Sequence, residues 1–162
     1  CYQLAVAGVL HDIGKLKLRS YINGQENNPL VIEELKYVRM HSALGYEELK
    51  DQGYSDFILE SILYHHENYD GSGYPDNRKA EQIPLGARIM HVADAFIALI
   101  SERPYREAFD FDSAIGIMIE DVKEFDMQVF LAFMDVIHED GMFDRIKQSQ
   151  SSIDYDMQEF DS

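Results

Sequence analysis

Apolar residues recur along most of this chain at the three- and four-residue spacing of amphipathic helices, and no stretch alternates as a β-strand would. Residues 85–100 are apolar on nearly every side, which predicts a central buried helix, and residues 1–10 also look mostly buried. Ser55 is the expected N-cap of a further helix. The predicted fold class is an all-α bundle, with helices over residues 1–10, 30–50, 56–67, 85–100, 112–123 and 127–139.

Polar connections with strong turn signals separate these helices. Asn23-Gly24 and Asn27-Asn28-Pro29 predict turns, Gly53 ends the helix before it, and the loop over residues 68–84 contains four glycine or proline residues. Residues 148–152 are too polar to belong to a core. We expect one domain over residues 1–140 and an acidic polar tail over residues 141–162.

Length and charge narrow the function classes. The chain has 162 residues with 14 basic and 30 acidic side chains, a formal charge of −16, which disfavours binding to a nucleic acid polymer. The excess is uneven, because residues 107–162 carry 15 acidic and only 3 basic side chains. An anionic substrate therefore needs a site with its own positive charge, and the motifs that could supply one lie before residue 107.

Cysteine content and hydropathy predict the compartment. A lone Cys1 cannot form an internal disulfide, which is typical of a reducing cytoplasm. The apolar run over residues 4–10 is too short to span a bilayer, and no signal peptide precedes it. We expect a cytoplasmic protein without membrane insertion.

One aspartate lies among apolar residues of the predicted central helix. Asp94 shares a helix face with Met90 and Ile97, where a bare carboxylate would be unfavourable. It needs a cation or dense hydrogen bonding, and an ion pair with Arg88 is one alternative.

Two doublets of polar residues occur at semi-buried positions. His11-Asp12 closes the first helix, whereas His66 lies one turn beyond Ile62 with His65 about 100° away around the helix axis. Adjacent imidazoles that point in different directions would suit two separate metal ions better than one.

Each of these residues also has a structural interpretation. A histidine such as His41, taken singly, is more often a hydrogen-bonded core residue, and Asp12 could cap a turn. His91 and His138 are assigned to such structural roles. Taken together, however, the mixed imidazole and carboxylate groups favour first-row divalent ions such as manganese, iron or zinc.

Several motifs occur together in a recognisable order, and in these blocks the chain resembles the HD-GYP family, the bacterial branch of the HD-domain metal-dependent phosphohydrolases. The similarity extends over about residues 5–135. The blocks are His11-Asp12-Ile13-Gly14-Lys15, His65-His66-Glu67-Asn68-Tyr69-Asp70-Gly71-Ser72-Gly73-Tyr74-Pro75, Ile83-Pro84-Leu85-Gly86-Ala87-Arg88-Ile89, Ala93-Asp94 and Ser101-Glu102-Arg103-Pro104-Tyr105-Arg106.

The resemblance implies an HD-domain helical bundle with two or three divalent metal ions, iron or manganese first and zinc as a further candidate. Such a centre would hydrolyse cyclic di-GMP to a linear dinucleotide or GMP by a metal-activated hydroxide. The positions that match the family's metal ligands are His11, Asp12, His41, His65, His66 and Asp94.

The resemblance also implies roles around the metals. Asp12 would bridge them, and Lys15, one turn further on, would approach a substrate phosphate. Gly73 allows a close backbone approach, and Tyr74 offers a stacking face for a guanine base. Arg103 and Arg106 match basic positions that hold phosphates and would form a second cationic clamp if their turn is helical.

Three positions depart from the family pattern. A ligand histidine expected about thirty residues before His11 is absent, which predicts an N-terminally truncated domain. Ile97 replaces a usual aspartate, and residues 16–23 lack a proline, which we interpret as loop variation. These gaps leave open a catalytically weak or inactive receptor or interaction module, or hydrolysis of another phosphoester, as well as an upstream sensor domain and a homodimer.

Overall fold

The computed structural model describes residues 1–22, 38–103 and 106–148, and its elements are helical apart from one isolated bridge between Arg103 and Arg106. The predicted all-α fold is therefore confirmed. In chain order the elements are α1 (Tyr2–Leu10), α2 (Lys15–Ile22), α4 (His41–Leu49), α5 (Asp56–Tyr64), the short 3₁₀ helix η1 (Ala80–Gln82), α6 (Leu85–Ile100), α7 (Phe111–Glu120), η2 (Val122–Glu124) and α8 (Met127–Ile137).

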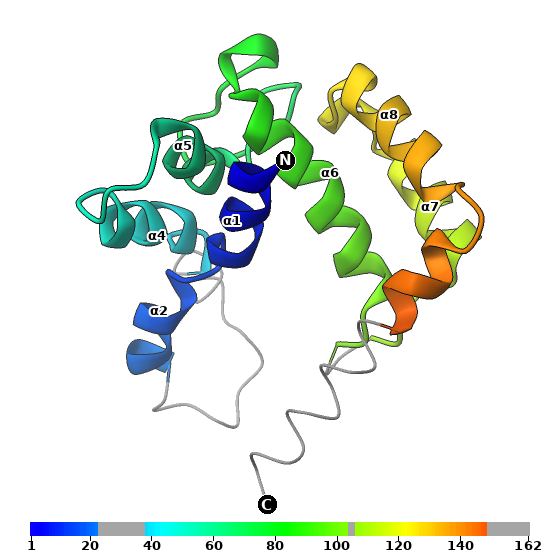
Figure 1. Cartoon of the computed structure of the whole chain (residues 1–162), viewed down its shortest axis with the longest axis horizontal. Helices are drawn as coiled ribbons and strands as arrows, with labels where there is room; N and C mark the ends of the chain where they lie inside the picture. The colour runs from blue at the N-terminus through cyan, green and yellow to red at the C-terminus, as the bar shows by residue number, and fades with distance from the viewer. Residues whose placement is uncertain (23–37, 104–105, 149–162) are drawn as a thin grey trace, which may run out of the picture.

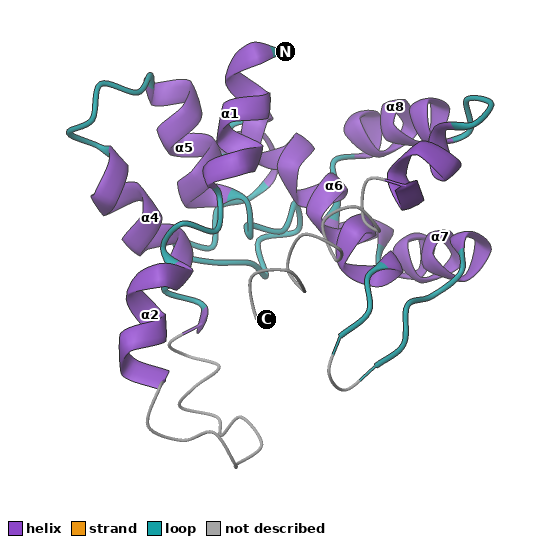
Figure 2. Ribbon diagram, turned by 60° about the horizontal axis from the view of Figure 1, so that its bottom comes forward, coloured by secondary structure: helices purple, strands orange, loops and turns teal. Residues whose placement is uncertain are grey.

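Helix α6 is the central element of the molecule (Figure 1). The helices α1, α4 and α5 lie on one side of it, and α7 and α8 lie on the other; the turned view in Figure 2 shows the same division. Met90 of α6 belongs to an apolar cluster with α1, α4 and α5, whereas Val92, Phe96 and Ile100 belong to a second cluster with α7 and α8. The candidate ligands lie on the first side.

Polar side chains fix where several helices begin. The Ser55 hydroxyl accepts the N–H of Ile58, as expected for the N-cap of α5. Asp110 caps α7 by accepting the N–H of Ser113, and Asp126 caps α8 by accepting the N–H of Gln128 at 2.8 Å. Such caps satisfy N–H groups that have no partner within the helix.

Several predicted boundaries agree with the structure, since α6 has the predicted bounds and α7 and α8 begin within one residue of theirs. The prediction that the first helix is mostly buried was wrong, because only Ala7 is buried in α1 and Val9 is 83% exposed. This helix packs on α5 and α6 through a single face.

Residues 16–22 were predicted as a polar connection but form most of α2, where Leu18 is buried. The helix predicted over residues 30–50 lies partly outside the described residues. A turn at Arg39 and Met40 interrupts it before α4 begins at His41.

The segment predicted as a tail contributes to the core where the structure describes it. Residues 142–148 are helical, and the Phe143 ring lies 4.8 Å from the Phe111 ring, centroid to centroid. Phe143 and Ile146 pack against the second cluster, so packing continues past the boundary that we placed at residue 140. Residues 149–162 lie outside the described part.

None of the described helices has both the length and the apolar character that a membrane span requires.

Candidate metal centre

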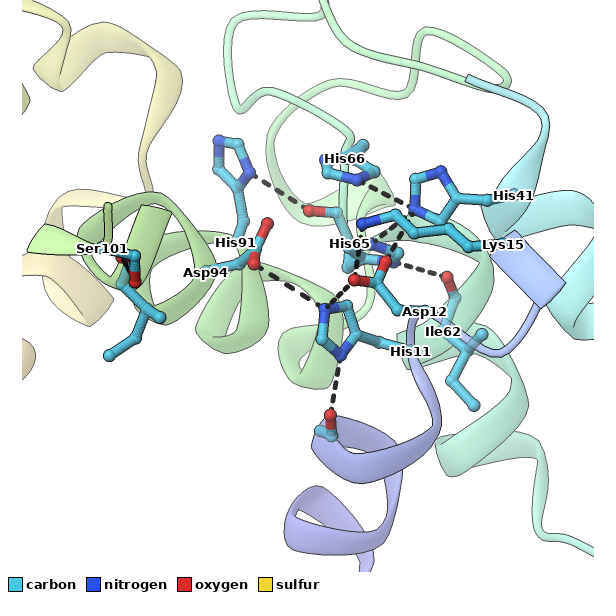
Figure 3. Close-up of polar contacts among 12 residues, drawn as sticks. His11, Asp12, Lys15, His41, Ile62, His65, His66, His91, Asp94 and Ser101 are labelled. Carbon is cyan, nitrogen blue, oxygen red and sulfur yellow. Dashed lines mark hydrogen bonds and ion pairs between the residues drawn. The ribbon is translucent and has the colours of Figure 1, made fainter. Parts of the chain in front are cut away.

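Side chains from four separate segments converge beside α6 (Figure 3). His11 and Asp12 come from the turn that follows α1, and His41 is the first residue of α4. His65 and His66 follow the last residue of α5. Asp94 faces the same place from the middle of α6. The structure thus brings together the six residues that the sequence predicted as ligands.

Three of the four histidines in this cluster are oriented by backbone carbonyl groups. Nδ1 of His11, His41 and His65 lies 2.7, 2.6 and 2.7 Å from the carbonyl oxygens of Gly8, Val38 and Ile62. A carbonyl oxygen can only accept, so each Nδ1 carries the proton and each Nε2 of the neutral ring presents a lone pair. Outer hydrogen bonds of this kind are typical of metal-binding histidines.

The Nε2 atoms then converge. His41 Nε2 lies 3.3 Å from His65 Nε2 and 3.1 Å from His66 Nε2. His11 Nε2 lies 3.4 Å from Asp12 Oδ2 and 3.7 Å from Asp94 Oδ1. Two sets of three ligand atoms each fall within 4.8 Å of one another, namely His41, His65 and His66, and His11, Asp12 and His65.

The two adjacent histidines do not point apart as predicted. Their ring centroids are 4.0 Å from each other, and both rings contact His41. The prediction was wrong because α5 ends at Tyr64, so His65 and His66 are not separated by the 100° step of a continuing helix. His65 instead belongs to both candidate ligand sets.

The electrostatics of the cluster favour neutral imidazoles. Burial lowers the pKa of His65 to about 4 and also lowers the pKa of His41 and His66. Asp94 raises the pKa of His11, and although burial opposes ionisation of Asp94, its contact with His11 holds the pKa of that carboxyl below its usual value.

This donor set fits divalent metal ions. Lone pairs that face one another at about 3 Å repel unless a cation lies between them. Asp12 Oδ1 is buried and makes no hydrogen bond to any described residue, although His41 Nε2 lies 3.4 Å away. Imidazole and carboxylate donors together suit first-row divalent ions.

Lys15 lies at the edge of the cluster. Its Nζ donates to Asp12 Oδ2 at 2.5 Å, and its side chain is about half exposed. The ammonium can therefore reach an anion at the cluster while it remains beside the carboxylate.

The loop after α5 covers the cluster. The Tyr74 ring stacks on His66 with centroids 4.8 Å apart, and burial raises the pKa of Tyr74 to about 12. Gly73 is required because a Cβ there would overlap the Asn68 nitrogen and the His66 carbonyl oxygen. The Tyr74 ring, which was predicted to stack on a guanine base, thus stacks on His66 in this structure.

Glu67 is a functional candidate to which the sequence analysis assigned no role. It is 1% exposed, and its carboxylate accepts the backbone N–H groups of Asp76 at 2.7 Å and Arg78 at 3.0 Å. These bonds fix the far end of the loop that carries Tyr74. The sequence feature that could have identified Glu67 is its position directly after two candidate ligands, His65 and His66.

The predicted clamp of two arginines takes a different form. Arg103 and Arg106 exchange backbone hydrogen bonds at 2.9 and 3.0 Å across the isolated bridge, so their turn is not helical. The Arg106 guanidinium donates to the carbonyl oxygens of Ala98 at 2.7 Å and Leu99 at 3.1 Å. It therefore stabilises the end of α6. Arg103 and Arg106 both line a cavity of about 370 Å³ that also includes His91.

Arg88 pairs with Asp126 and not with Asp94. His91 Nδ1 lies 3.1 Å from the carbonyl oxygen of His65, and exposed His138 bonds the carbonyl oxygen of Met134 through Nδ1 at 2.8 Å. Neither of these two histidines belongs to the sets of candidate ligands within the described residues.

Comparisons with known proteins identify the family of the chain. The HD domain family model matches residues 1–129. The cyclic di-GMP phosphodiesterase response regulator RpfG of Xanthomonas campestris is 41% identical over 116 residues, covering 70% of this chain and 30% of that protein. The cyclic di-GMP phosphodiesterase PA4108 of Pseudomonas aeruginosa is 38% identical over 136 residues, covering 83% of this chain and 33% of that protein.

A third relative, the 3′3′-cGAMP-specific phosphodiesterase 3 of Vibrio cholerae, is 37% identical over 116 residues, covering 72% of this chain and 25% of that protein. A crystal structure of a cyclic GMP-AMP specific phosphodiesterase, V-cGAP3 of V. cholerae, has a TM-score of 0.65 at 16% identity, covering 87% of this chain and 39% of that one, and shares its fold. The chain thus spans about a third or less of the curated relatives' length. The resemblance to HD-GYP proteins is confirmed, and the chain belongs to the HD-domain family.

Proposed function

We propose that this chain is the metal-dependent phosphodiesterase domain of a larger signalling protein, and that it hydrolyses cyclic di-GMP to a linear dinucleotide or GMP. The observation that carries the proposal is the convergence of carbonyl-oriented Nε2 atoms with the carboxylates of Asp12 and Asp94. The names of the curated relatives support cyclic dinucleotides as the substrate class.

His11, Asp12, His41, His65, His66 and Asp94 would hold two or three ions, iron or manganese first and zinc as a further candidate. When bound, such ions supply Lewis-acid activation of a water molecule and stabilise the charge that develops on a phosphodiester. His65 belongs to both candidate ligand sets, but its single Nε2 lone pair can serve only one ion. Asp12 contacts His11 through Oδ2 and His41 through Oδ1, so this carboxylate would serve neighbouring ions.

The surrounding residues would orient the substrate. Lys15 would donate to a non-bridging phosphate oxygen, which offsets charge developing in the transition state. Gly73 and Tyr74 would form the wall over the cluster, and Tyr74 would donate its hydroxyl proton in hydrogen bonds because it stays protonated at neutral pH. A phosphate contact by Arg103 stays a prediction, because its cavity is lined by none of the candidate ligands, and Arg106 would hold the end of α6.

The cellular setting is part of the proposal. A single exposed cysteine is typical of a reducing compartment, and we propose a cytoplasmic location. An upstream sensor domain and a homodimer remain predictions.

The substitution His41→Ala tests the proposed function. His41 contacts three other candidate ligands, so its loss should reduce turnover by more than the roughly 10- to 100-fold effect typical of outer partners of a metal site. Metal content per chain should fall as well. The measurements are hydrolysis of cyclic di-GMP by the manganese- or iron-loaded full-length protein, and metal analysis by mass spectrometry.

His138→Ala is the matched control, because His138 is exposed and contacts Met134 and Phe111, not the candidate ligands. It should retain both metal and turnover. If the loaded, unsubstituted protein binds cyclic di-GMP without cleaving it, the receptor alternative replaces the enzymatic one. If it cleaves only other phosphoesters, the assigned substrate class is wrong.

A further inference from the structure

Positive charge at the cluster is scarce. Lys15 is bound to Asp12, and the guanidinium of Arg106 is bound to carbonyl oxygens of α6. The chain as a whole has 30 acidic against 14 basic side chains, so an anionic substrate gains nothing from the overall field. Arg103 lines a cavity that none of the candidate ligands lines. A dinucleotide at the cluster therefore needs a further local cation.

Arg39 occupies such a position. It lies in the turn before α4, two residues before His41, and is exposed. Its guanidinium carbon lies 5.4 Å from the Tyr74 ring centroid, over the ring, within the range of a cation–π contact. Because Tyr74 stacks on His66, the three side chains form a stack of imidazole, phenol and guanidinium.

The stack places Arg39 one aromatic ring away from a candidate metal ligand. His66 stacks on the Tyr74 ring and Arg39 lies over it, so the guanidinium is an exposed cationic group held at this ring. A guanidinium presents several N–H donors in a planar fork that matches the oxygens of a phosphate.

The charge of Arg39 is not neutralised within the described part of the chain. No described carboxylate lies within ion-pair distance of it, whereas acidic partners are present for Lys15, Lys17, Lys50, Arg78 and Arg88. An exposed guanidinium that is held by an aromatic ring, with no carboxylate partner among residues 1–22, 38–103 and 106–148, can bind an anion.

Resting on the proposed function, we propose that Arg39 binds the second phosphate of the cyclic dinucleotide, the one that is not being cleaved. A cyclic dinucleotide has two phosphodiester groups, and only one can occupy the cluster at a time. The other remains a full anion through the reaction. Arg39 would hold it equally in the ground state and in the transition state, which is the definition of uniform binding.

Arg39→Gln tests this inference, because glutamine keeps a planar polar end and removes the charge. A charge-assisted hydrogen bond contributes about 1.5–3 kcal/mol, so KM for cyclic di-GMP should rise about tenfold or more. Uniform binding predicts that kcat stays within about threefold. Arg39→Lys, which keeps the charge and loses the fork, should recover part of the affinity.

A substrate with one phosphate separates this role from a general effect on the cluster. Bis(4-nitrophenyl) phosphate has a single phosphodiester, so Arg39→Gln should leave its kinetics unchanged. Arg145→Gln, the same substitution at an exposed arginine in the helical segment after α8, should change neither substrate's kinetics. Unequal effects on the two substrates would support the inference.

Several outcomes would overturn it. Equal loss for both substrates would make Arg39 a positioning residue for the cluster, and an unchanged KM for cyclic di-GMP would remove it from binding while the proposed function stands. If the loaded protein binds cyclic di-GMP without turnover, the same tenfold change should appear in Kd, measured by calorimetry. A protein that neither binds nor cleaves a cyclic dinucleotide would overturn the proposed function and this inference with it.

Discussion

At the scale of single residues, backbone carbonyl groups determine the chemistry of the cluster. Each of His11, His41 and His65 donates from Nδ1 to the carbonyl oxygen three residues before it, a contact that helical or turn geometry supplies. The sequence motifs identified which histidines would converge, but local helix ends decided how they point. The direction of His66 depended on α5 ending at Tyr64, and hydrophobic periodicity does not locate such an end.

Arg39 and Glu67 were missed for a related reason. Neither fits a metal-ligand pattern, and the position of each depends on the loop that carries Tyr74. Contacts between a loop and a remote turn follow from the fold as a whole, so a reading of local sequence cannot supply them.

Glu67→Ala should destabilise the protein and displace the loop. It removes the buried carboxylate that accepts the N–H groups of Asp76 and Arg78, and a hydrogen bond to a charged group contributes about 1.5–3 kcal/mol. The free energy of unfolding, measured with urea, should fall by at least about 2 kcal/mol, and KM for the substrate should rise as Tyr74 shifts. Glu81→Ala, a substitution in the same loop that removes an exposed bond to Tyr69, should change stability by no more than about 0.5 kcal/mol.

At the scale of elements, apolar periodicity predicted the longest helix best. Residues 85–100 form α6 because the run is apolar enough to be covered on several sides, and its ends are marked by Pro84 and by the polar Ser101. By contrast, α2 mixes lysine and leucine in Lys15-Leu16-Lys17-Leu18, where the spacing is too short to show a helical face. This helix is fixed by tertiary packing on α4, which buries Leu18.

Asp126 joins two elements, so its substitution should show two separable effects. The carboxylate caps α8 and pairs with Arg88, whose side chain is only 17% exposed. Asp126→Ala removes both interactions and leaves a buried cation, which should cost about 3–5 kcal/mol. Asp126→Asn keeps the cap, so it should be more stable than the alanine variant by about 1 kcal/mol.

Asp110→Ala serves as the matched control for a cap alone. Asp110 caps α7 from an exposed position, and no described cation pairs with it, so the loss should be about 1 kcal/mol. Thermal unfolding of the four proteins measures these differences. Equal losses for Asp126→Ala and Asp110→Ala would contradict a structural role for the buried ion pair.

At the scale of the whole molecule, the centre and the helices α7 and α8 of the acidic region lie on different sides of α6. The candidate ligands come from α1, α4, α5 and α6, whereas residues 107–162 carry half of the acidic side chains. The sequence alone shows this uneven distribution of charge. That Phe143 and Ile146 of this acidic region pack into a core was not, because their neighbours are polar and only the folded helix brings the two together on one face.

Metal binding should stabilise one side of the molecule more than the other. A ligand present at 100 times its Kd stabilises the folded state by about 2.7 kcal/mol, so removal of metal with EDTA should lower Tm. Because the ligands join α1, α4, α5 and α6, hydrogen exchange should slow in these helices on loading with manganese and change less in α7 and α8. A uniform change along the chain, or no shift in Tm, would count against a metal centre at this place.

Gly14 has a consequence for any attempt to re-engineer the site. A Cβ at this position would overlap the carbonyl oxygen of His41, so the turn that carries His11 and Asp12 rests main chain against main chain on the first turn of α4. No side chain at this contact can be trimmed or enlarged. The separation of Asp12 and His41 is therefore a property of the polypeptide path itself, and a redesigned core or a grafted loop would change what surrounds these two residues without changing how far apart they are held.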